Sequence, residues 1–376
     1  MAGVGLVLLA FSSLLAAASA SRALTVGAVS AEPGQMVSGW VEVPEGPSPP
    51  GSTGSPDRGT RIPVTVANGA KPGAVLALVA GTHGYEYTSI IALQRLRARL
   101  DPARMSGAVI LVHLANPPTF YGRRIYYGPD GKNLNRMYPG RQDGTISERI
   151  AHAMTEEVIA KSTHLADMHC GDGNESLRPY SYWMISGNAA VDEASKQMAL
   201  AYGLDHIVVD RDRPADPARS VYTANTAILR GKPAITTESG GMGLTDEASV
   251  AAHEAGALSL IAHLKIMDAP QIGVEKPLWI VRGEVLRAPQ DGLWRPVVEK
   301  MQMVAAGTLI GRLTDPFGTV VQEIRAPFGG EVLYVVATPP VAKDEPLAYV
   351  GEISLQEPRP ADRQPTPEAE AARAGR

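Results

Sequence analysis

The stretch of residues 74–100 constrains the fold more than any other part of the sequence. Residues 74–80 form an apolar run with the length and composition of a buried strand. A histidine and a glutamate follow three residues apart, His83 and Glu86, and residues 87–100 then carry apolar side chains at helical spacing. The two side chains are therefore predicted to lie on a strand-to-helix turn. In open α/β sheets, ligands and catalytic groups collect at such turns, beyond the carboxyl ends of the strands.

Apolar runs and helical patterns alternate along most of the chain. Further strands are predicted at residues 108–115, 164–170 and 232–238, and further helices at 146–162, 189–202 and 246–267. Such alternation predicts an α/β domain with a largely parallel or mixed sheet. A long connection at residues 116–145 is dense in Arg, Asn and Tyr, which indicates a functional loop.

The pattern changes after Pro270. Residues 278–351 contain short apolar runs separated by Gly and Pro, which predicts a small all-β barrel or sandwich. The end of the chain is rich in Pro, Glu, Ala and Arg and is predicted to be disordered. The expected segments are a signal sequence at 1–20, a catalytic domain at 21–270, a β domain at 271–354 and a tail at 355–376.

The first 20 residues resemble a secretory signal sequence. Residues 4–15 form an apolar core, and Ala18-Ser19-Ala20 fits a cleavage site between small residues. The start of the chain lacks Lys and Arg, so a retained membrane anchor is the alternative. Because the apolar run is short for a span of about 20 residues, we favour cleavage. The mature protein is then expected to be periplasmic or secreted, without a stable membrane span.

Composition limits the kinds of partner and chemistry. The 376-residue chain has a net charge of −4 and no long basic run, which argues against nucleic acid as the main partner. Cys170 is the only cysteine, so an intramolecular disulfide cannot form, and we interpret this residue as a buried inert thiol. The sequence also lacks the Gly-x-Ser-x-Gly and His-Glu-x-x-His motifs of two other hydrolase classes.

Three candidate metal ligands lie at the ends of predicted strands: His83, Glu86 and His169. Two histidines and one glutamate are a known ligand set for catalytic zinc, which leaves a position open for water or substrate. A single histidine is more often an ordinary hydrogen-bonded side chain, so spacing alone leaves both interpretations open. Asp167 lies two residues before His169 and shares its face of the strand. It is either an outer partner that orients His169 or an ordinary carboxylate at the sheet end.

Two further groups offer the chemistry that a hydrolase needs. Glu238 ends an apolar strand directly before Ser-Gly-Gly, where a partly buried carboxylate would face the same cleft. It could take a proton from water and return it to a leaving amine, or serve only to cap a helix. The long connection contains Arg123-Arg124 and Asn133-Leu-Asn-Arg136, which suit a carboxylate or a developing oxyanion. A solvated charged loop is the alternative.

In combination, these motifs resemble the succinylglutamate desuccinylase/aspartoacylase family of zinc-dependent deacylases. The matching motifs are Gly81-Thr-His-Gly-Tyr-Glu86, Asn116-Pro117, Asp130-Gly-Lys-Asn-Leu-Asn-Arg136 with Pro139-Gly140, Asp167-Met-His169 and Glu238-Ser-Gly-Gly. Their order and spacing are specific, and the resemblance extends over about residues 60–351. It implies an α/β fold with a zinc-carboxypeptidase-like mixed sheet flanked by helices, followed by the small all-β domain.

The resemblance also implies roles for individual residues. The ligands of one zinc ion per chain would be His83, Glu86 and His169. Glu238 matches the catalytic glutamate of the family, and Asn135 and Arg136 match the pair that holds the substrate carboxylate. The family uses an arginine upstream of this pair to polarise the scissile carbonyl. We assign Arg124 to this role and Arg123 to substrate binding, with Arg123 as the alternative for the first role.

The expected activity is hydrolysis of the amide bond of an N-acyl amino acid or a related small amide that bears a carboxylate. The secretory signal departs from the named amino-acid catabolic members, which are intracellular, so no particular acyl group is inferred. A zinc carboxypeptidase acting on peptides or cell-wall fragments would use the same metal and Arg136. A non-catalytic binding protein would use the β domain. A homo-oligomer is compatible with all three functions.

Overall fold

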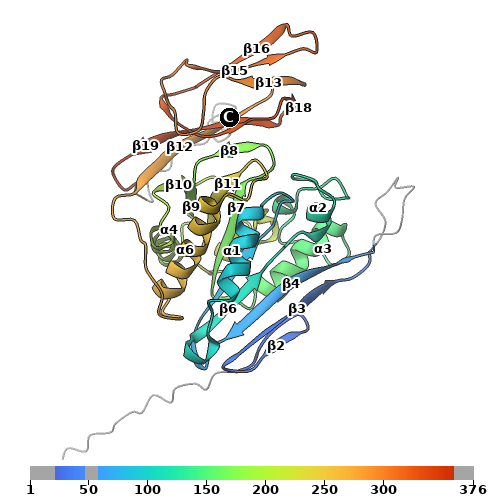
Figure 1. The fold of residues 1–376 in the computed structure, drawn as a ribbon, viewed down its shortest axis with the longest axis vertical. Coiled ribbons are helices and arrows are strands. Elements are labelled where there is room, and N and C mark those ends of the chain that lie inside the picture. The colour runs from blue at the N-terminus through green and yellow to red at the C-terminus, as the bar shows by residue number, and fades with distance from the viewer. Residues whose placement is uncertain (1–21, 47–57, 360–376) are drawn as a thin grey trace, which may run out of the picture.

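The computed structural model describes residues 22–46 and 58–359. The predicted signal sequence at 1–20 lies outside these residues, and so does the tail beyond residue 359. Within the described ranges, no helix combines the length and apolar character needed to cross a membrane. Figure 1 shows an elongated arrangement in which the last strands form one end of the molecule.

A mixed β-sheet forms the backbone of the molecule. Its central strands, in spatial order, are β3 (Gln35–Val43), β4 (Thr60–Asn68), β6 (Ser106–Val112), β5 (Lys71–Ala80), β7 (His164–Gly171), β11 (Ala234–Gly241), β9 (Tyr180–Met184), β10 (His206–Asp210) and β12 (Leu278–Arg287). Strand β5 is parallel to β6 and β7, and β7 is parallel to β11. The carboxyl ends of β5, β7 and β11 therefore meet at one edge of the sheet. A short hairpin of β1 (Leu24–Val26) and β2 (Val29–Ala31) forms a sheet of its own that packs against β3 and β4.

Strand β5 shows why the central strands have continuous apolar sequences. Leu76, Leu78 and Ala80 pack into one hydrophobic cluster, while Ala77 and Val79 pack into a second cluster on the opposite face. Side chains alternate between the faces of a strand, and both faces here are covered. A polar residue in either position would be buried without a partner.

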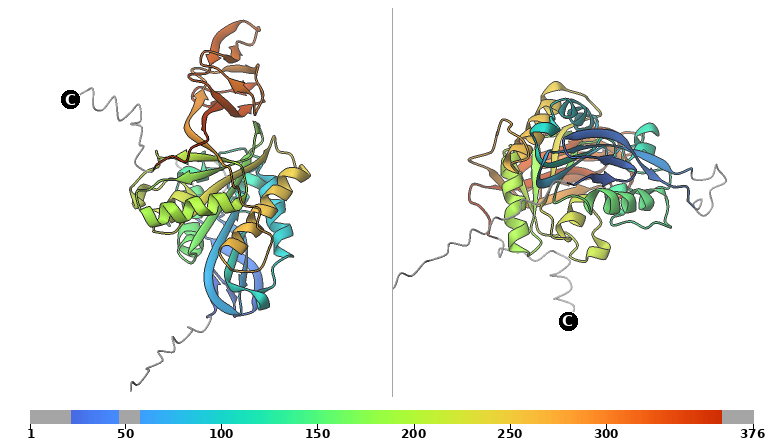
Figure 2. Two further views of the ribbon diagram at one scale, coloured as in Figure 1. Left: turned by 90° about the vertical axis from the view of Figure 1, so that its left-hand side faces the viewer. Right: turned by 90° about the horizontal axis from the view of Figure 1, so that it is seen from below.

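Helices cover both faces of the sheet, as Figures 1 and 2 show. The first face carries α1 (Tyr87–Arg97), α4 (Ala189–Tyr202) and α6 (Glu247–His263). The second carries α3 (Ile146–Ala153), a π-helix (Met154–Ile159) and α5 (Thr223–Ile228). Short 3₁₀ turns occur at Pro102–Arg104, Leu134–Arg136 and Pro217–Arg219. The helices expected at 87–100, 189–202 and 246–267 are present, and the one expected at 146–162 changes to a π-helix at Met154.

Some elements were not predicted from the sequence. The long connection contains the short helix α2 (Pro117–Tyr121), which begins where Asn116 Oδ1 accepts a hydrogen bond from the Thr119 backbone N–H at 3.4 Å. Strands β8 (Glu175–Leu177) and β9 and helix α5 were also missed. Each is short, and β8 pairs with a strand from the end of the chain.

The C-terminal region is all-β and antiparallel, as the sequence predicted. Four of its strands form a separate sheet: β16 (Val320–Arg325), β15 (Leu309–Thr314), β13 (Gly292–Pro296) and β18 (Pro340–Val341). The others, β19 (Pro346–Ser354), β17 (Gly330–Val336) and β14 (Met303–Val304), extend the large sheet beyond β12. The two sheets enclose a core of their own that includes Trp294, Ile310 and Leu347. We refer to residues 278–354 as the β region.

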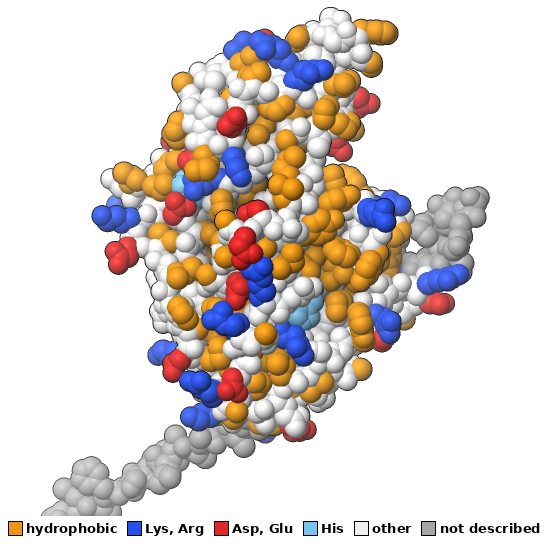
Figure 3. Space-filling model, viewed as in Figure 1, with side chains coloured by type: hydrophobic (Ala, Val, Ile, Leu, Met, Phe, Trp, Pro, Cys, Tyr) orange, Lys and Arg blue, Asp and Glu red, His pale blue; other side chains and the backbone are white. Residues whose placement is uncertain are grey.

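The surface shown in Figure 3 combines two kinds of feature. Charged side chains of both signs lie along the junction of α1 and α6, where Arg95 pairs with Glu247 and Arg99 with Glu254. Hydrophobic side chains gather beside them, toward α2, whose Tyr121 is 75% exposed.

Candidate active site

The turn after β5 places His83 and Glu86. Gly81 has a φ of 67°, and a Cβ there would lie 2.7 Å from Leu114 Cδ1, so only glycine fits without strain. Glu86 is the N-cap residue of α1, and its Oε2 accepts a hydrogen bond from the His83 backbone N–H at 2.9 Å. This contact fixes the two side chains relative to each other.

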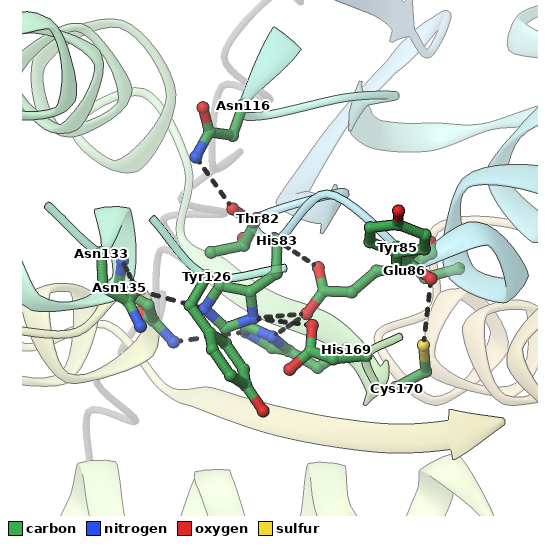
Figure 4. A network of polar contacts seen from close by, with 12 residues as sticks. Thr82, His83, Tyr85, Glu86, Asn116, Tyr126, Asn133, Asn135, His169 and Cys170 are labelled. Atoms are coloured by element: carbon green, nitrogen blue, oxygen red, sulfur yellow. Dashed lines mark hydrogen bonds and ion pairs between the residues drawn. The ribbon is translucent and has the colours of Figure 1, made fainter. Parts of the chain in front are cut away.

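The three predicted ligands come together in one buried cluster, shown in Figure 4. His83 Nδ1 lies 2.9 Å from Glu86 Oε1, and His169 Nδ1 lies 2.5 Å from the same oxygen. His169 comes from β7, which is parallel to β5. The three residues are at most 8% exposed, and their donor atoms lie within 4.8 Å of one another. The group could bind a metal ion.

The outer sides of both imidazole rings are also occupied. His83 Nε2 lies 3.2 Å from Asn133 Oδ1, and His169 Nε2 lies 2.9 Å from Asp167 Oδ2. The two Nδ1 atoms are thus the ring nitrogens directed at the shared carboxylate. Metal-binding histidines commonly have such a partner on the second nitrogen, so the donor set fits a metal.

Burial and charge act in opposite directions on this cluster. Burial alone would lower the pKa of His83, but the carboxylates of Asp172 and Glu86 outweigh it and raise the pKa to about 10. Burial would raise the pKa of Glu86, but the two histidines outweigh it and lower the pKa to about 2. The carboxylates around the two histidines therefore favour positive charge at this point of the structure.

Glu238 lies beside the cluster, as its position at a strand end suggested. In the sheet it is the register partner of His169 on β7 and of Tyr180 on β9. Its Oε2 is buried and has no hydrogen-bond partner among the described residues. Burial raises the pKa of the Glu238 carboxyl well above its ordinary value. Such a carboxyl holds a proton more readily than an exposed one, which suits a group that takes up and returns a proton.

The structure also brings Asn135 to the cluster, with Arg136 next to it. Asn135 Nδ2 lies 3.4 Å from His169 Nε2, and its Oδ1 accepts a hydrogen bond from the Thr223 backbone N–H at 3.2 Å. The Arg136 guanidinium lies over the ring of Tyr222, 4.6 Å from its centroid, and is exposed. It can therefore reach a carboxylate that enters from solvent.

Arg123 and Arg124 lie beside the turn that carries His83, since the Gly84 backbone N–H donates to the Ile125 carbonyl oxygen at 3.1 Å. Both residues are exposed, and neither side chain makes a hydrogen bond or ion pair with another described residue. Arg123 has a φ of 52°, and its carbonyl oxygen accepts a hydrogen bond from the Tyr85 hydroxyl at 3.4 Å. Their assignment to the scissile carbonyl and to substrate binding stays a prediction.

Sequence reasoning missed three polar residues close to the cluster. Asp172 is buried, with Oδ1 3.3 Å from His83 Nδ1. Glu175 is buried on β8 and accepts a hydrogen bond from the Tyr126 hydroxyl at 3.0 Å. The available signal was the sequence Gly-Asp-Gly-Asn-Glu directly after β7, since polar residues after a buried strand lie at the edge that carries the site. Cys170, by contrast, is buried as expected.

A surface hollow of about 660 Å³ lies in the β region, away from this cluster. It is lined by residues such as Asp291, Asp315 and Val321, and none of the residues described above borders it. The convergent titratable groups therefore lie in the α/β part, and the hollow has no comparable chemistry.

Fold and site together define an α/β protein with a buried His-Glu-His cluster beyond the carboxyl ends of its central strands. A sequence model of the succinylglutamate desuccinylase/aspartoacylase catalytic domain matches residues 72–264. The chain belongs to this family of N-acyl amino acid deacylases. The resemblance inferred from the motifs and the predicted fold class are both confirmed.

The chain is also similar to a curated enzyme of known activity. It is 30% identical over 262 residues to the N-alpha-acetyl-L-2,4-diaminobutyric acid deacetylase of Halomonas elongata, a match that covers 68% of this chain and 74% of that enzyme. The product-bound structure of the ectoine utilization protein EutE (DoeB) from Ruegeria pomeroyi has 26% identity and a TM-score of 0.73, over 84% of this chain and 95% of that one.

A succinylglutamate desuccinylase structure from Silicibacter sp. gives the same TM-score of 0.73, with 23% identity over 85% of this chain and 95% of that one. At this identity the similarity concerns the fold alone. It includes the β region, because the match covers more of the chain than the catalytic domain occupies.

Proposed function

We propose that the protein is a zinc-dependent hydrolase that cleaves the amide bond of an N-acyl amino acid or a related small amide bearing a carboxylate. The observation that carries this proposal is the buried convergence of His83 Nδ1 and His169 Nδ1 on Glu86, with Glu238 in register beside His169. The Halomonas relative supports an N-acetyl amino acid as the kind of substrate.

His83, Glu86 and His169 would hold the zinc ion. Two imidazole nitrogens and a carboxylate are a donor set of catalytic zinc, and Asp167 and Asn133 hold the rings in place from outside. When bound, zinc polarises the scissile carbonyl and makes water more acidic.

Glu238 would move the proton. Its unpartnered Oε2 takes a proton from the attacking water and passes it to the nitrogen of the leaving amine. The raised pKa of the buried carboxyl suits this transfer, because the group holds the proton taken from water and gives it to the nitrogen as the C–N bond breaks.

The long connection would bind the substrate. Asn135 and Arg136 anchor its carboxylate beside the cluster, and the fork of the Arg136 guanidinium matches the two oxygens. Arg124, or its neighbour Arg123, would stabilise the oxyanion that forms at the carbonyl. That role requires the exposed side chain to turn into the cleft when substrate binds.

We further propose that the enzyme acts in the periplasm or after secretion, on the basis of residues 1–20.

The test compares the wild type with Glu238→Gln for zinc content and for hydrolysis of a panel of N-acyl amino acids and short peptides. The variant should keep about one zinc ion per chain and lose turnover on the order of 10²- to 10⁴-fold. Glu247→Gln is a matched control, because Glu247 is exposed at the start of α6 and pairs with Arg95 of α1 rather than with a residue of the cluster. Full activity of Glu238→Gln would remove it from the proton-transfer role. Cleavage of peptides alone would indicate a carboxypeptidase, and a wild type without zinc or turnover would indicate a binding protein.

A further inference from the structure

Asp172, Glu175 and Tyr126 form a second polar group beside the cluster, which the proposed reaction does not use. The carboxylates are 5% and 8% exposed. The Tyr126 hydroxyl donates to Glu175 Oε1 at 3.0 Å and lies 3.1 Å from Asn174 Oδ1, and the Tyr126 ring is edge-on to His83 with centroids 5.6 Å apart. We call these three residues the acidic wall.

The acidic wall lacks a cation of its own. Within the described part of the chain, no Lys or Arg pairs with Asp172 or Glu175, and the close cationic neighbour of Asp172 is His83 Nδ1 at 3.3 Å. That nitrogen is a predicted metal ligand and would then have no proton to offer. Asp172 Oδ1 accepts no hydrogen bond from the described residues, and Glu175 is hydrogen-bonded through its Oε1 to the Tyr126 hydroxyl.

Buried carboxylates without a Lys or Arg counter-charge are costly, so their presence needs a reason. A ligand that brings a positive charge would remove this penalty. The open oxygens of Asp172 and Glu175 and the Tyr126 hydroxyl offer acceptors for such a group.

The acidic wall and the segment that leads into the predicted carboxylate anchor face opposite nitrogens of the His83 ring. Asn133, three residues before Arg136, faces Nε2 of this ring, whereas Asp172 faces Nδ1. In Figure 4, Asn133 and Asn135 lie together on one side of His83, and the Tyr126 side chain extends away from them. A substrate that spans the cluster can therefore meet opposite charges at its two ends.

We propose that the acidic wall is a subsite for an ammonium group of the substrate, so that the preferred amide is zwitterionic, with its carboxylate at Arg136 and its ammonium at Asp172 and Glu175. This inference rests on the proposed amide hydrolysis and narrows its substrate class. The ammonium can belong to the acyl part or to the amine part, and the two cases are separable by substrate choice.

The test measures kcat/KM of the zinc-loaded full-length protein for two matched pairs of substrates. Glycyl-L-alanine and N-acetyl-L-alanine differ by an ammonium on the acyl part. Nα-acetyl-L-lysine and N-acetyl-L-norleucine differ by an ammonium on the amine part. In at least one pair the cationic member should be preferred by about tenfold or more, as for hydrogen bonds to charged groups. Glu175→Gln should lower that preference by about tenfold, with its zinc content equal to that of the wild type.

Glu42→Gln is the matched control, since Glu42 is an exposed residue on β3, and it should keep the preference. If the wild type shows equal kcat/KM for the two members of each pair, the ammonium subsite is overturned and the proposed amide hydrolysis stands. This outcome does not depend on whether any variant folds. Loss of zinc from Glu175→Gln would also overturn it, because the wall would then be part of a metal site. Absence of turnover of all four substrates by zinc-loaded wild type would overturn the proposed function, and the inference with it.

Discussion

The imidazole rings of His83 and His169 are preset by their outer partners. The orientation of Asn133 is fixed because its Oδ1 also accepts the backbone N–H of Asn135 at 2.9 Å. This oxygen can only accept, so it favours the proton of His83 on Nε2 and leaves a lone pair on Nδ1. Asp167 favours the same tautomer of His169. Two lone pairs directed at one carboxylate oxygen are the arrangement that a cation stabilises.

His113, which follows β6, is a histidine of a different kind. Its Nε2 is hydrogen-bonded to Thr65 Oγ1 at 2.8 Å, its Nδ1 is buried without a partner among the described residues, and the charged group that faces it is Arg97. Burial, with a smaller contribution from Arg97, lowers the pKa of His113 to about 4. The unfolded chain therefore binds a proton below about pH 6.5 that the folded protein excludes until about pH 4.

The free energy of unfolding should consequently fall as the pH drops from 6.5 toward 4. Urea unfolding of the wild type and His113→Gln at pH 7 and pH 5 measures this contribution. The wild type should lose about 2 kcal/mol more than the variant between these pH values. Equal losses would show that His113 titrates normally in the folded protein.

At the scale of elements, the predictable parts were those whose pattern is set locally. Strands β5, β7 and β11 are buried on both faces, so their apolar runs identify them, and the residues at their carboxyl ends include His169 and Glu238. Strand β8 has three residues and exists because it pairs with β17, far along the chain, so no local signal marks it. Glu175 was missed for this reason. The conformation of the long connection that carries Arg124 depends on what surrounds it, so its sequence alone does not define it.

A buried charge network joins β10 to β17. Arg178 Nη1 donates to Glu331 Oε1 at 2.8 Å, Arg178 Nη2 lies 3.0 Å from Asp205 Oδ1, and His206 Nε2 lies 3.2 Å from Glu331 Oε2. Arg178 and Glu331 are 7% and 6% exposed. The network therefore fixes the β region against the α/β part at a desolvated point.

Replacing Glu331 by leucine should be strongly destabilising, because it leaves the Arg178 charge buried with one partly exposed partner, Asp205. The expected loss in the free energy of unfolding is about 3–5 kcal/mol, measured by urea denaturation. Glu323→Leu is the matched control, since Glu323 forms ion pairs on the exposed strand β16, and it should cost much less than Glu331→Leu. A loss for Glu331→Leu no larger than that of the control would mean that the network contributes little to stability.

At the scale of the whole molecule, the β region is continuous with the catalytic sheet. Strand β12 is parallel to β10 over His206–Val208 and antiparallel to β19, so the large sheet passes from one part into the other without a break. A shared hydrophobic cluster joins Leu177 and Tyr180 of the α/β part to Leu333 and Tyr349 of the β region. Through β17 the same region holds β8, and with it Glu175 of the acidic wall.

A chain ending at residue 270 should therefore fail to form a stable catalytic domain. Its β10 would have an unpaired hydrogen-bonding edge, β8 would lose its partner strand, and Arg178 and Leu177 would lose the residues that cover them. A strand edge with unpaired hydrogen-bonding groups favours aggregation. A buried charge that has lost its partner destabilises the folded state. The expected result is an aggregated or unfolded product by size-exclusion chromatography and near-ultraviolet circular dichroism. A chain ending at residue 359 keeps every described contact and should behave as the full-length protein. If the chain ending at residue 270 were instead a monomer with a cooperative unfolding transition, the α/β part would be an independent domain, and the β region would act on the site only by docking to it.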